Sequence, residues 1–184
     1  MKNSILFCIA ICFLTVSYGQ KSPAALKITY LKSSNGKLIE NQDPVVVFAN
    51  TERTIVTTLN ILAKKAEYPI EQSYVDRKTG NYVQLARFAN GKAAITIDST
   101  SLQKQSFELL TETKMILGYK CAKAKTIINS NTIEIWYTND LIHKGAPTSL
   151  GQNLGLVLEM TRNGNFTVLA QKVEKLKNIP AELS

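Results

Sequence analysis

Tight-turn dipeptides recur along this chain, and short apolar-rich runs fill the stretches between them. Asn35-Gly36 and Asn90-Gly91 are the dipeptides most typical of two-residue β-hairpin turns. Before the first of them, Leu26, Ile28 and Tyr30 alternate with mostly polar residues, which indicates a strand with one buried face. A regular spacing of strands and turns is typical of an antiparallel sandwich, a barrel or a curled sheet. The sequence therefore predicts an all-β domain.

The same pattern predicts the other strands. They are expected at 45–48, at 55–59, around Tyr74, and at 82–88, 93–98, 114–128 (interrupted near Gly118), 132–138, 154–160 and 166–173. The segment 102–113 is the one helix candidate, although its apolar residues fit neither the helical nor the strand period well. We expect little helix in total.

Two segments fall outside the strand pattern. Asp140–Asn153 is the one long loop expected in the second half of the chain, and loops of this length are more often functional than short ones. After Val173 the chain becomes charged and polar, and we expect this tail to fray or to lead elsewhere. The predicted domain core is therefore about 26–175, with a tail at 176–184.

The N-terminus has the pattern of a secretory signal peptide. Lys2 precedes an apolar run at 5–16, and small residues at Ser17 and Gly19 occupy the positions before a cleavage site. The run is shorter than the roughly 20 apolar residues of a membrane-spanning helix, so an uncleaved anchor is the lesser alternative. We predict a signal peptide at 1–19 and one mature domain at 20–184, exported to the periplasm, the outer surface or the medium.

Cleavage before Gln20 removes two of the three cysteines and leaves Cys121 alone, without an intramolecular disulfide partner. A lone cysteine is more often a small buried hydrophobe than a reactive thiol, and we expect that role. Lys120 and Lys123 flank Cys121, and we expect strand alternation to place both on the opposite face.

The formal net charge of +8 is spread along the whole chain. Binding of nucleic acid requires a concentrated basic patch, so this class of partner is not expected. A peripheral contact with an anionic surface is the better functional interpretation of the charge.

The sequence shows no catalytic constellation. A metal site would depend on the single histidine, His143, and on Asp140, which are too few ligands. The chain has neither a nucleophile elbow nor a phosphate-binding loop. Glu134 and Glu159 could be imagined as paired catalytic carboxylates, but cross-strand ion pairs with lysine are the simpler expectation. We expect no catalytic residue, no metal ion, no cofactor and no enzymatic activity.

The candidate ligand-binding residues are two adjacent aromatic residues and the long loop that follows them. Trp136 and Tyr137 are neighbours in a predicted strand, so one is expected in the core and the other on the concave surface. An aromatic ring in a concavity commonly binds sugars or lipid chains. We expect the loop with Asp140, His143 and Gly145 to line the rim beside Trp136. The alternative is that both aromatics pack in the core or at a sheet edge.

Asp98-Ser99-Thr100 is a candidate modification site. It resembles the three-residue O-glycosylation signal of exported Bacteroidetes proteins, with Ser99 as the modified residue. A simple turn at the end of a strand explains the same residues equally well.

Three longer segments carry a family resemblance: Ile116–Ala124, Ile135–Asp140 and Gly151–Glu159. In this order and spacing they resemble the GLPGLI family of exported Bacteroidetes proteins, and most closely the N-terminal bowl-like domain of peptide N-glycosidase F-II. Where the GLPGLI family normally has its name-giving hexapeptide, this chain has Gln152-Asn153-Leu154-Gly155-Leu156-Val157, without the proline. The missing proline favours the bowl-like domain.

The resemblance implies a single curled antiparallel sheet that forms an open bowl or half-barrel. It implies no catalytic residues here, because the amidase activity of the glycosidase lies in a large domain after this one. We therefore expect a non-catalytic binding or accessory module that holds a lipid, a glycan or a peptide in its concavity. The alternative is a protein-interaction or structural module that positions a partner or a catalytic domain, and an uncharacterised hydrolase is the third interpretation. Both a stand-alone bowl and a fragment of a longer enzyme fit the sequence.

Overall fold

The computed structural model describes residues 24–183, so the predicted signal peptide lies outside the described part of the chain. These residues form one antiparallel sheet of twelve strands. The strands are β1 (Ala25–Ser34), β2 (Lys37–Leu38), β3 (Val45–Ala49), β4 (Arg53–Thr58), β5 (Ile70–Asp76), β6 (Asn81–Arg87), β7 (Ala93–Asp98), β8 (Glu108–Ile116), β9 (Tyr119–Ile128), β10 (Asn131–Thr138), β11 (Leu156–Arg162) and β12 (Phe166–Leu176).

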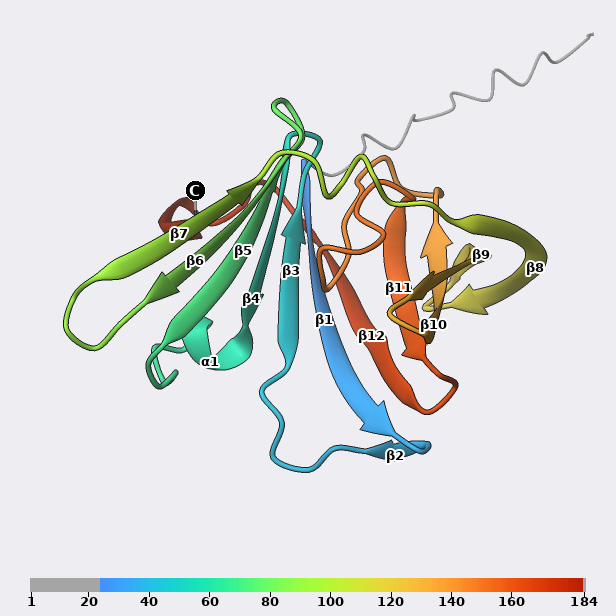
Figure 1. Cartoon of the computed structure of the whole chain (residues 1–184), viewed down its shortest axis with the longest axis horizontal. Coiled ribbons are helices and arrows are strands. Elements are labelled where there is room, and N and C mark those ends of the chain that lie inside the picture. Colours follow the sequence, from blue (N-terminus) through green and yellow to red (C-terminus); the bar gives the residue numbers. More distant parts are fainter. Residues whose placement is uncertain (1–23, 184) are drawn as a thin grey trace, which may run out of the picture.

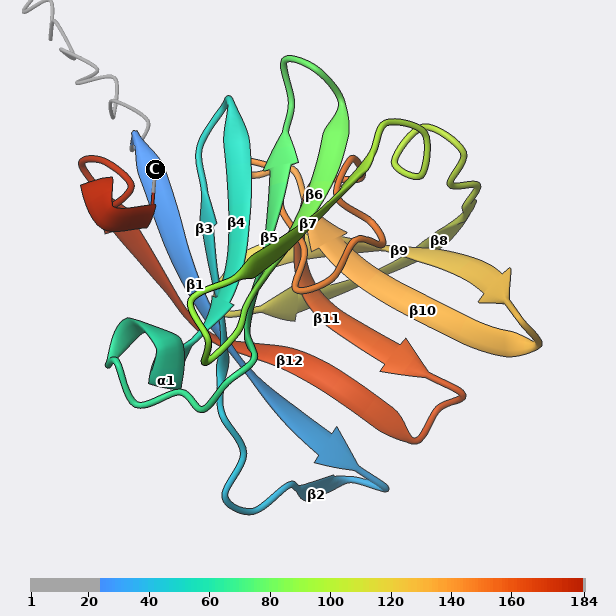
Figure 2. The same cartoon turned by 60° about the vertical axis from the view of Figure 1, so that its left-hand side comes forward.

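The sheet is open and curled. Its strands follow the order β7-β6-β5-β4-β3-β1-β12-β11-β10-β9-β8, with β2 paired to β1 alone. The two end strands, β7 and β8, do not pair with each other, so the barrel is not closed. Instead β4–β7 form one wall and β8–β11 the other, with β1, β3 and β12 between them (Figures 1 and 2). The prediction of an all-β bowl or half-barrel with little helix is confirmed.

Hairpin turns account for most of the strand order. In the turn after β1, Asn35 and Gly36 both have positive φ angles, of 50° and 75°. Two successive left-handed residues make the turn whose twist matches that of paired strands, which is why the Asn-Gly dipeptide is such a strong signal. Leu117 and Gly118, at φ 52° and 82°, form the equivalent turn between β8 and β9.

The helix prediction at 102–113 is wrong, because β8 begins at Glu108. This strand lies at the edge of the sheet and has β9 as its single strand neighbour, so few of its residues are buried and its alternation is weak. The helices that do occur were not predicted. The strand expected at 55–59 ends at Thr58, which caps the single-turn helix α1 (Leu59–Leu62), and a 3-10 turn, η1, spans Ala181–Leu183.

The C-terminal tail folds back onto the domain, in contrast to the expected fraying. Leu183 is only 9% exposed and packs in a cluster with Val46, Phe48 and Ile55 of β3 and β4. Ile179 packs against the same cluster. This contact is made by apolar residues that lie between the charged ones. The prediction of fraying considered only the average polarity of the tail.

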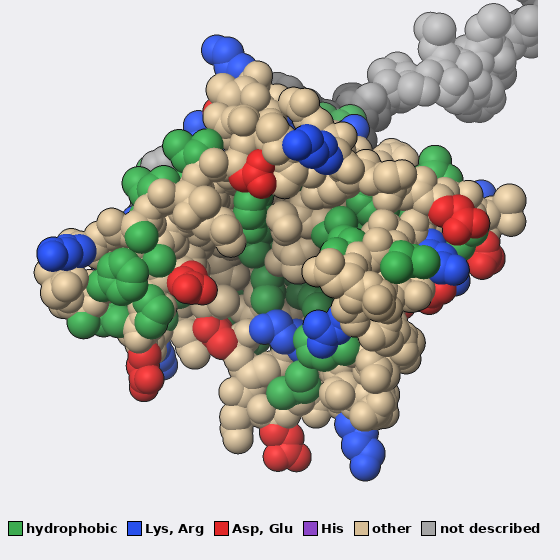
Figure 3. All heavy atoms as spheres, in the orientation of Figure 1, with side chains coloured by type: hydrophobic (Ala, Val, Ile, Leu, Met, Phe, Trp, Pro, Cys, Tyr) green, Lys and Arg blue, Asp and Glu red, His purple; other side chains and the backbone are tan. Residues whose placement is uncertain are grey.

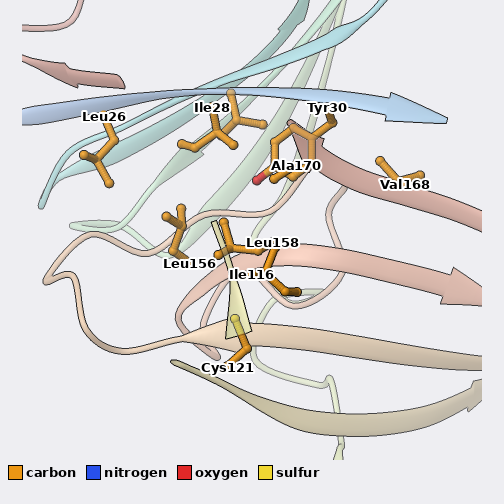
Figure 4. Packing of buried hydrophobic residues seen from close by; sticks show 10 residues of the cluster. Leu26, Ile28, Tyr30, Ile116, Cys121, Leu156, Leu158, Val168 and Ala170 are labelled. Atoms are coloured by element: carbon orange, nitrogen blue, oxygen red, sulfur yellow. The ribbon is translucent and has the colours of Figure 1, made fainter. Parts of the chain in front are cut away.

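The core lies in the concavity of the curled sheet. The space-filling view shows the opening between the two walls, with hydrophobic side chains deep inside it (Figure 3). Leu26, Ile28 and Tyr30 of β1 point toward Leu156 and Leu158 of β11 and toward the β8–β9 end (Figure 4). The Tyr30 hydroxyl is buried there and donates a 2.6 Å hydrogen bond to the backbone oxygen of Val157.

Candidate functional site

The long segment between β10 and β11 crosses the inside of the bowl. The Gly145 backbone accepts a hydrogen bond from Val157 N at 2.8 Å and donates one to Gly155 O at 3.0 Å. Ala146 is fully buried in a cluster with residues of β10 and β11, and Pro147 is also buried. The loop is therefore packed against the concave side of the sheet, where Figure 2 shows it between the two walls.

Arg77, directly after β5, anchors the loop to the opposite wall. Its guanidinium donates to the backbone oxygens of Lys144 at 2.7 Å and Gln152 at 3.1 Å. The same group donates to the hydroxyl of Thr54 at 2.8 Å and to the side-chain oxygen of Asn153 at 3.3 Å. Burial lowers the pKa of Arg77, but a guanidinium stays charged across the biological pH range.

The loop is also held from within by Gln152, whose side chain is fully buried. Its amide nitrogen donates to the backbone oxygens of Ala146 at 2.9 Å and Thr148 at 2.6 Å. These bonds close the loop on itself and give the backbone oxygens of Ala146 and Thr148 a donor from the protein.

A hollow of about 380 Å³ lies between this loop and the wall formed by β3–β7. This size is near the lower end of the range of small-molecule sites. The hollow is lined by Val45, Val56, Thr57, Thr58, Glu71, Gln72, Ser73, Gln84, Leu85, Ala86, Ala94, Thr96 and Pro147. We call it the wall hollow.

The floor of the wall hollow is a row of mostly polar side chains. Val56, Ser73, Gln84 and Thr96 are successive cross-strand partners on β4, β5, β6 and β7, so their side chains share one face. The next row on the same face contains Glu71, Ala86 and Ala94. The hollow thus combines hydroxyl, amide and carboxylate groups with small apolar side chains.

Several of these polar groups have no partner in the described part of the chain. Among residues 24–183, no hydrogen bond or ion pair engages the side chain of Glu71, Gln84 or Thr96, whereas Ser73 accepts a 3.0 Å bond from the Tyr82 hydroxyl. Thr57 and Gln72 are bonded to each other at 3.2 Å. The free groups are available to a ligand, and the bonded ones hold the wall in shape.

The predicted ligand-binding residues lie elsewhere and do not share one surface. Tyr137 is 8% exposed and packs in the cluster of Ala146, which matches the expectation that one of the two aromatics is in the core. Trp136 is half-buried against the other large cluster, and it does not line the wall hollow.

Trp136 is covered by charged side chains. The Lys114 ammonium lies 4.3 Å from the centre of its ring and the Lys123 ammonium 5.5 Å. Lys114 pairs with Glu159 at 2.6 Å, and Lys123 pairs with Glu134 at 2.9 Å. Both glutamates are therefore paired with lysine. Lys123–Glu134 joins the neighbouring strands β9 and β10, as predicted, whereas Lys114–Glu159 joins β8 to β11, which are not adjacent in the sheet. The Trp136 ring takes part in a cation–π contact.

Of the two predicted loop residues, Asp140 is bonded to the backbone and His143 is buried. The Asp140 carboxylate accepts a 2.9 Å bond from the backbone nitrogen of Lys120. His143 is 1% exposed, and burial lowers its pKa, although the nearby backbone of Ala24 opposes that shift. Neither ring nitrogen meets a hydrogen-bond partner of good geometry in the described part of the chain. His143 and Gly145 are therefore buried inside the bowl, whereas Asp140 is exposed.

The remaining predicted features have simple places in the fold. Asp98 accepts hydrogen bonds at 2.8 Å from the backbone nitrogens of Thr100 and Ser101, so the Asp-Ser-Thr segment forms a turn with Ser99 exposed. No group of three metal-ligating side chains occurs among residues 24–183. In the same range no helix is long and apolar enough to cross a membrane.

Cys121 is fully buried, and burial raises the pKa of its thiol to about 11. Lys123 is two residues away on the same strand and so shares its face, which corrects the expectation that both flanking lysines lie opposite. Nevertheless, burial outweighs the effect of nearby positive charge, because Lys114 lowers the pKa less than burial raises it.

We expect Cys121 to react slowly with iodoacetamide in the folded protein. At pH 9 a thiol with this pKa is about 1% ionised, whereas an exposed thiol is roughly half ionised, and the thiolate is the reactive form. Labelling followed by peptide mass spectrometry should show at least a tenfold increase in rate at Cys121 in 8 M urea. Equal rates in the folded and unfolded states would show that the thiol is accessible and ordinary.

The sequence alone predicted neither the wall hollow nor the role of Arg77 in holding the loop. In β5–β7, polar residues alternate with larger side chains, and this pattern indicates that one face of these strands does not belong to the hydrophobic core. However, the row from Val56 to Thr96 depends on the register of three strand pairs. Arg77 follows a strand in an ordinary turn, and no local signal points to partners 67 or 75 residues away.

Comparisons with known proteins agree on one relationship. The family model described as "N-glycanase peptide, N-terminal domain" matches residues 28–184. Two solved structures of PNGF-II, in the P21 and C2 space groups, are 43% identical to this chain over 86% of its length, with TM-scores of 0.83 and 0.82. The chain covers only 30% and 29% of those two chains. A comparison with curated proteins found no match.

Proposed function

The chain belongs to the family of N-glycanase peptide N-terminal domains, and we propose that it is an exported, non-catalytic binding module for a glycan or a short peptide. The observation that carries this proposal is the wall hollow, where the side chains of Glu71, Gln84 and Thr96 face a space of about 380 Å³ and have no partner within residues 24–183. Export is proposed from the signal-like residues 1–19, and the wider GLPGLI relationship from the three sequence segments.

The chemistry of the wall hollow favours a polar ligand over a lipid chain. Hydroxyl, amide and carboxylate groups on one face of the sheet can each exchange hydrogen bonds with sugar hydroxyls or peptide groups. A lipid tail would leave these groups desolvated and unpaired, at a cost of about 1–3 kcal/mol each. Because the family is named after an N-glycanase, we test a glycan first.

Gln84→Ala and Glu71→Gln should each weaken glycan binding, and together by at least tenfold. Removal of a group that bonds directly to a ligand typically costs about 1 kcal/mol, and more if the group is charged. The measurement is a calorimetric titration with three probes: an N-glycan released from a glycoprotein, the same glycan on its peptide, and the bare peptide.

Gln171→Ala is the matched control, since Gln171 is an exposed strand glutamine away from the wall hollow. It should leave every affinity unchanged. The proposal fails if none of the three probes binds at millimolar concentration, or if binding is insensitive to changes at both Gln84 and Glu71.

A second function is favoured by the size of the relatives. The chain matches 30% of one PNGF-II structure, so most of that protein lies outside the shared domain. We therefore keep the alternative that the bowl positions a partner or a catalytic domain. A domain of this kind binds its partner with the wall hollow empty, and the Gln84 and Glu71 variants would not change that binding.

A further inference from the structure

The two edges of the open sheet differ in character. At one edge, β8 carries Glu108, Glu112 and Lys114 among its nine residues. Charged side chains are a common means by which natural proteins protect an edge strand from pairing with another chain. At the other edge, β7 reads Ala-Ala-Ile-Thr-Ile-Asp, and its residues 93–97 are all exposed and uncharged. The β7 edge therefore lacks this protection.

An apolar surface continues from β7 onto β6. Ile95 and Ile97 are 64% and 63% exposed. They lie opposite Leu85 and Val83 of β6, so the four side chains form two adjacent apolar pairs on one face of the sheet. The space-filling view shows hydrophobic side chains gathered at this end of the molecule, over β6 and β7 (Figure 3).

In β7 the two isoleucines, Ile95 and Ile97, flank Thr96 symmetrically. If two copies of β7 pair antiparallel with Thr96 opposite itself, Ile95 of each copy lies opposite Ile97 of the other. Ala94 then faces Asp98 of the second copy. Lys92 lies two residues before Ala94 on the same face, and so becomes a diagonal neighbour of that Asp98, within reach of a long side chain. Both Lys92 and Asp98 lack an ion pair among residues 24–183.

We propose that the β7 edge binds a second copy of this chain, by antiparallel pairing centred on Thr96. The pairing is isologous, because the same residues meet on both sides of a two-fold axis. It joins two twelve-stranded sheets into one continuous sheet and satisfies the free backbone groups of β7. On one face it places four isoleucines side by side, and on the other face it places a Lys92–Asp98 ion pair at each end.

The pairing also brings two wall hollows together. Ala94 and Thr96 of β7 line the wall hollow, so in the dimer the two hollows meet across the axis. The dimer would thus present one longer trough with a two-fold repeat of polar groups. The dimer itself needs no ligand, so its test is independent of the proposed binding function.

The interface is small, since one six-residue strand and four isoleucines bury less than a standard protein–protein interface of about 1,600 Å². A dissociation constant of about 10–100 µM is therefore expected. Sedimentation equilibrium across 1–500 µM, without ligand, should show a monomer that converts to a dimer. Ile97→Lys should raise the dissociation constant at least tenfold, because it sets two lysines beside the isoleucines of the other copy.

Ile127→Lys is the matched control, because Ile127 is 66% exposed on β9, far along the sheet order from β7. Neither lysine variant should change the melting temperature appreciably, since both side chains are mostly exposed. The geometry is tested separately by Thr96→Cys, which should form a disulfide-linked dimer on air oxidation, whereas the parent chain should not. Two residues directly opposite in antiparallel strands lie within disulfide reach.

Three results would overturn the proposal. The first is a monomer at every concentration up to 500 µM. The second is a dimer that Ile97→Lys and Ile127→Lys affect equally, which would place the contact elsewhere. The third is a dimer in which Thr96→Cys is not cross-linked, which would show that the edges do not pair in this register.

Discussion

Gly155→Ala lowers the free energy of unfolding by about 3–4 kcal/mol, an unusually large effect for the addition of one methyl group. A Cβ atom at this position would lie 2.6 Å from the backbone oxygen of Thr138 and 2.7 Å from the side-chain oxygen of Asn139. It would also lie 3.0 Å from Cδ2 of Tyr137. The nearest obstacle is thus a backbone atom, which cannot turn aside as the end of a flexible side chain can.

The surroundings of Gly155 leave little room for adjustment. Thr138 is paired with Leu156 in the ladder between β10 and β11, so its oxygen is fixed by the sheet. Gly155 itself accepts the 3.0 Å bond from Gly145 that starts the closure of the loop. Either the end of β10 or the loop must move, and both are buried inside the bowl.

Gly164→Ala separates this steric effect from the ordinary cost of replacing glycine. Gly164 has a φ angle of 69° and no atom within 4 Å of a Cβ, so its substitution costs only the strain of a left-handed residue, about 1 kcal/mol. Equilibrium unfolding in urea measures both variants. A loss at Gly155 no greater than that at Gly164 would mean that the loop relaxes easily and that the close approach is not a constraint.

Local sequence patterns predict the strands well because a hairpin depends on neighbours. The alternation of Leu26, Ile28 and Tyr30 and the Asn35-Gly36 turn need no information from distant residues, and β7 was predicted with its observed bounds, 93–98. The prediction at 102–113 failed for a related reason. An edge strand with one neighbour buries little, so its sequence does not show the period from which a strand is recognised.

The candidate site was harder to predict, because its residues come together through the curl of the sheet. Sequence alone indicates that Trp136 and Tyr137 face opposite sides, and their two different clusters agree. It does not indicate that Lys114 and Lys123, from two other strands, cover the indole ring. Nor does it show that the long loop crosses the bowl, with the wall hollow between the loop and β3–β7. Those facts depend on strand order and register, which no single strand encodes.

Arg77 joins the loop to the wall that carries β5, in addition to the bonds that Gln152 and the Gly145 backbone make within the second half of the chain. We expect Arg77→Met to lower the free energy of unfolding by about 3 kcal/mol and to free the loop locally. Four acceptors lose a bond from Arg77: the backbone oxygens of Lys144 and Gln152, the Thr54 hydroxyl and the Asn153 amide oxygen. The Lys144 oxygen keeps a 3.1 Å bond from the Thr54 hydroxyl. A hydrogen bond from a charged donor contributes about 1.5–3 kcal/mol, but the acceptors nearest the surface regain water, so the sum is smaller than four such bonds.

Two measurements distinguish loss of this anchor from general damage. Urea unfolding gives the stability, and hydrogen exchange followed by mass spectrometry should show faster exchange across residues 140–155, with β1 and β12 unchanged. Arg162→Met is the matched control: Arg162 is exposed and contacts Phe166, with 5.2 Å between the guanidinium carbon and the ring centre, so its loss should cost under about 1 kcal/mol. Arg77→Lys should recover only part of the stability, because a single ammonium group cannot bond to all the acceptors that the two NH2 groups of the guanidinium reach. If Arg77→Met exchanges like the parent chain at 140–155, then Gln152 and the Gly145 backbone bonds are sufficient to hold the loop, and Arg77 is not its anchor.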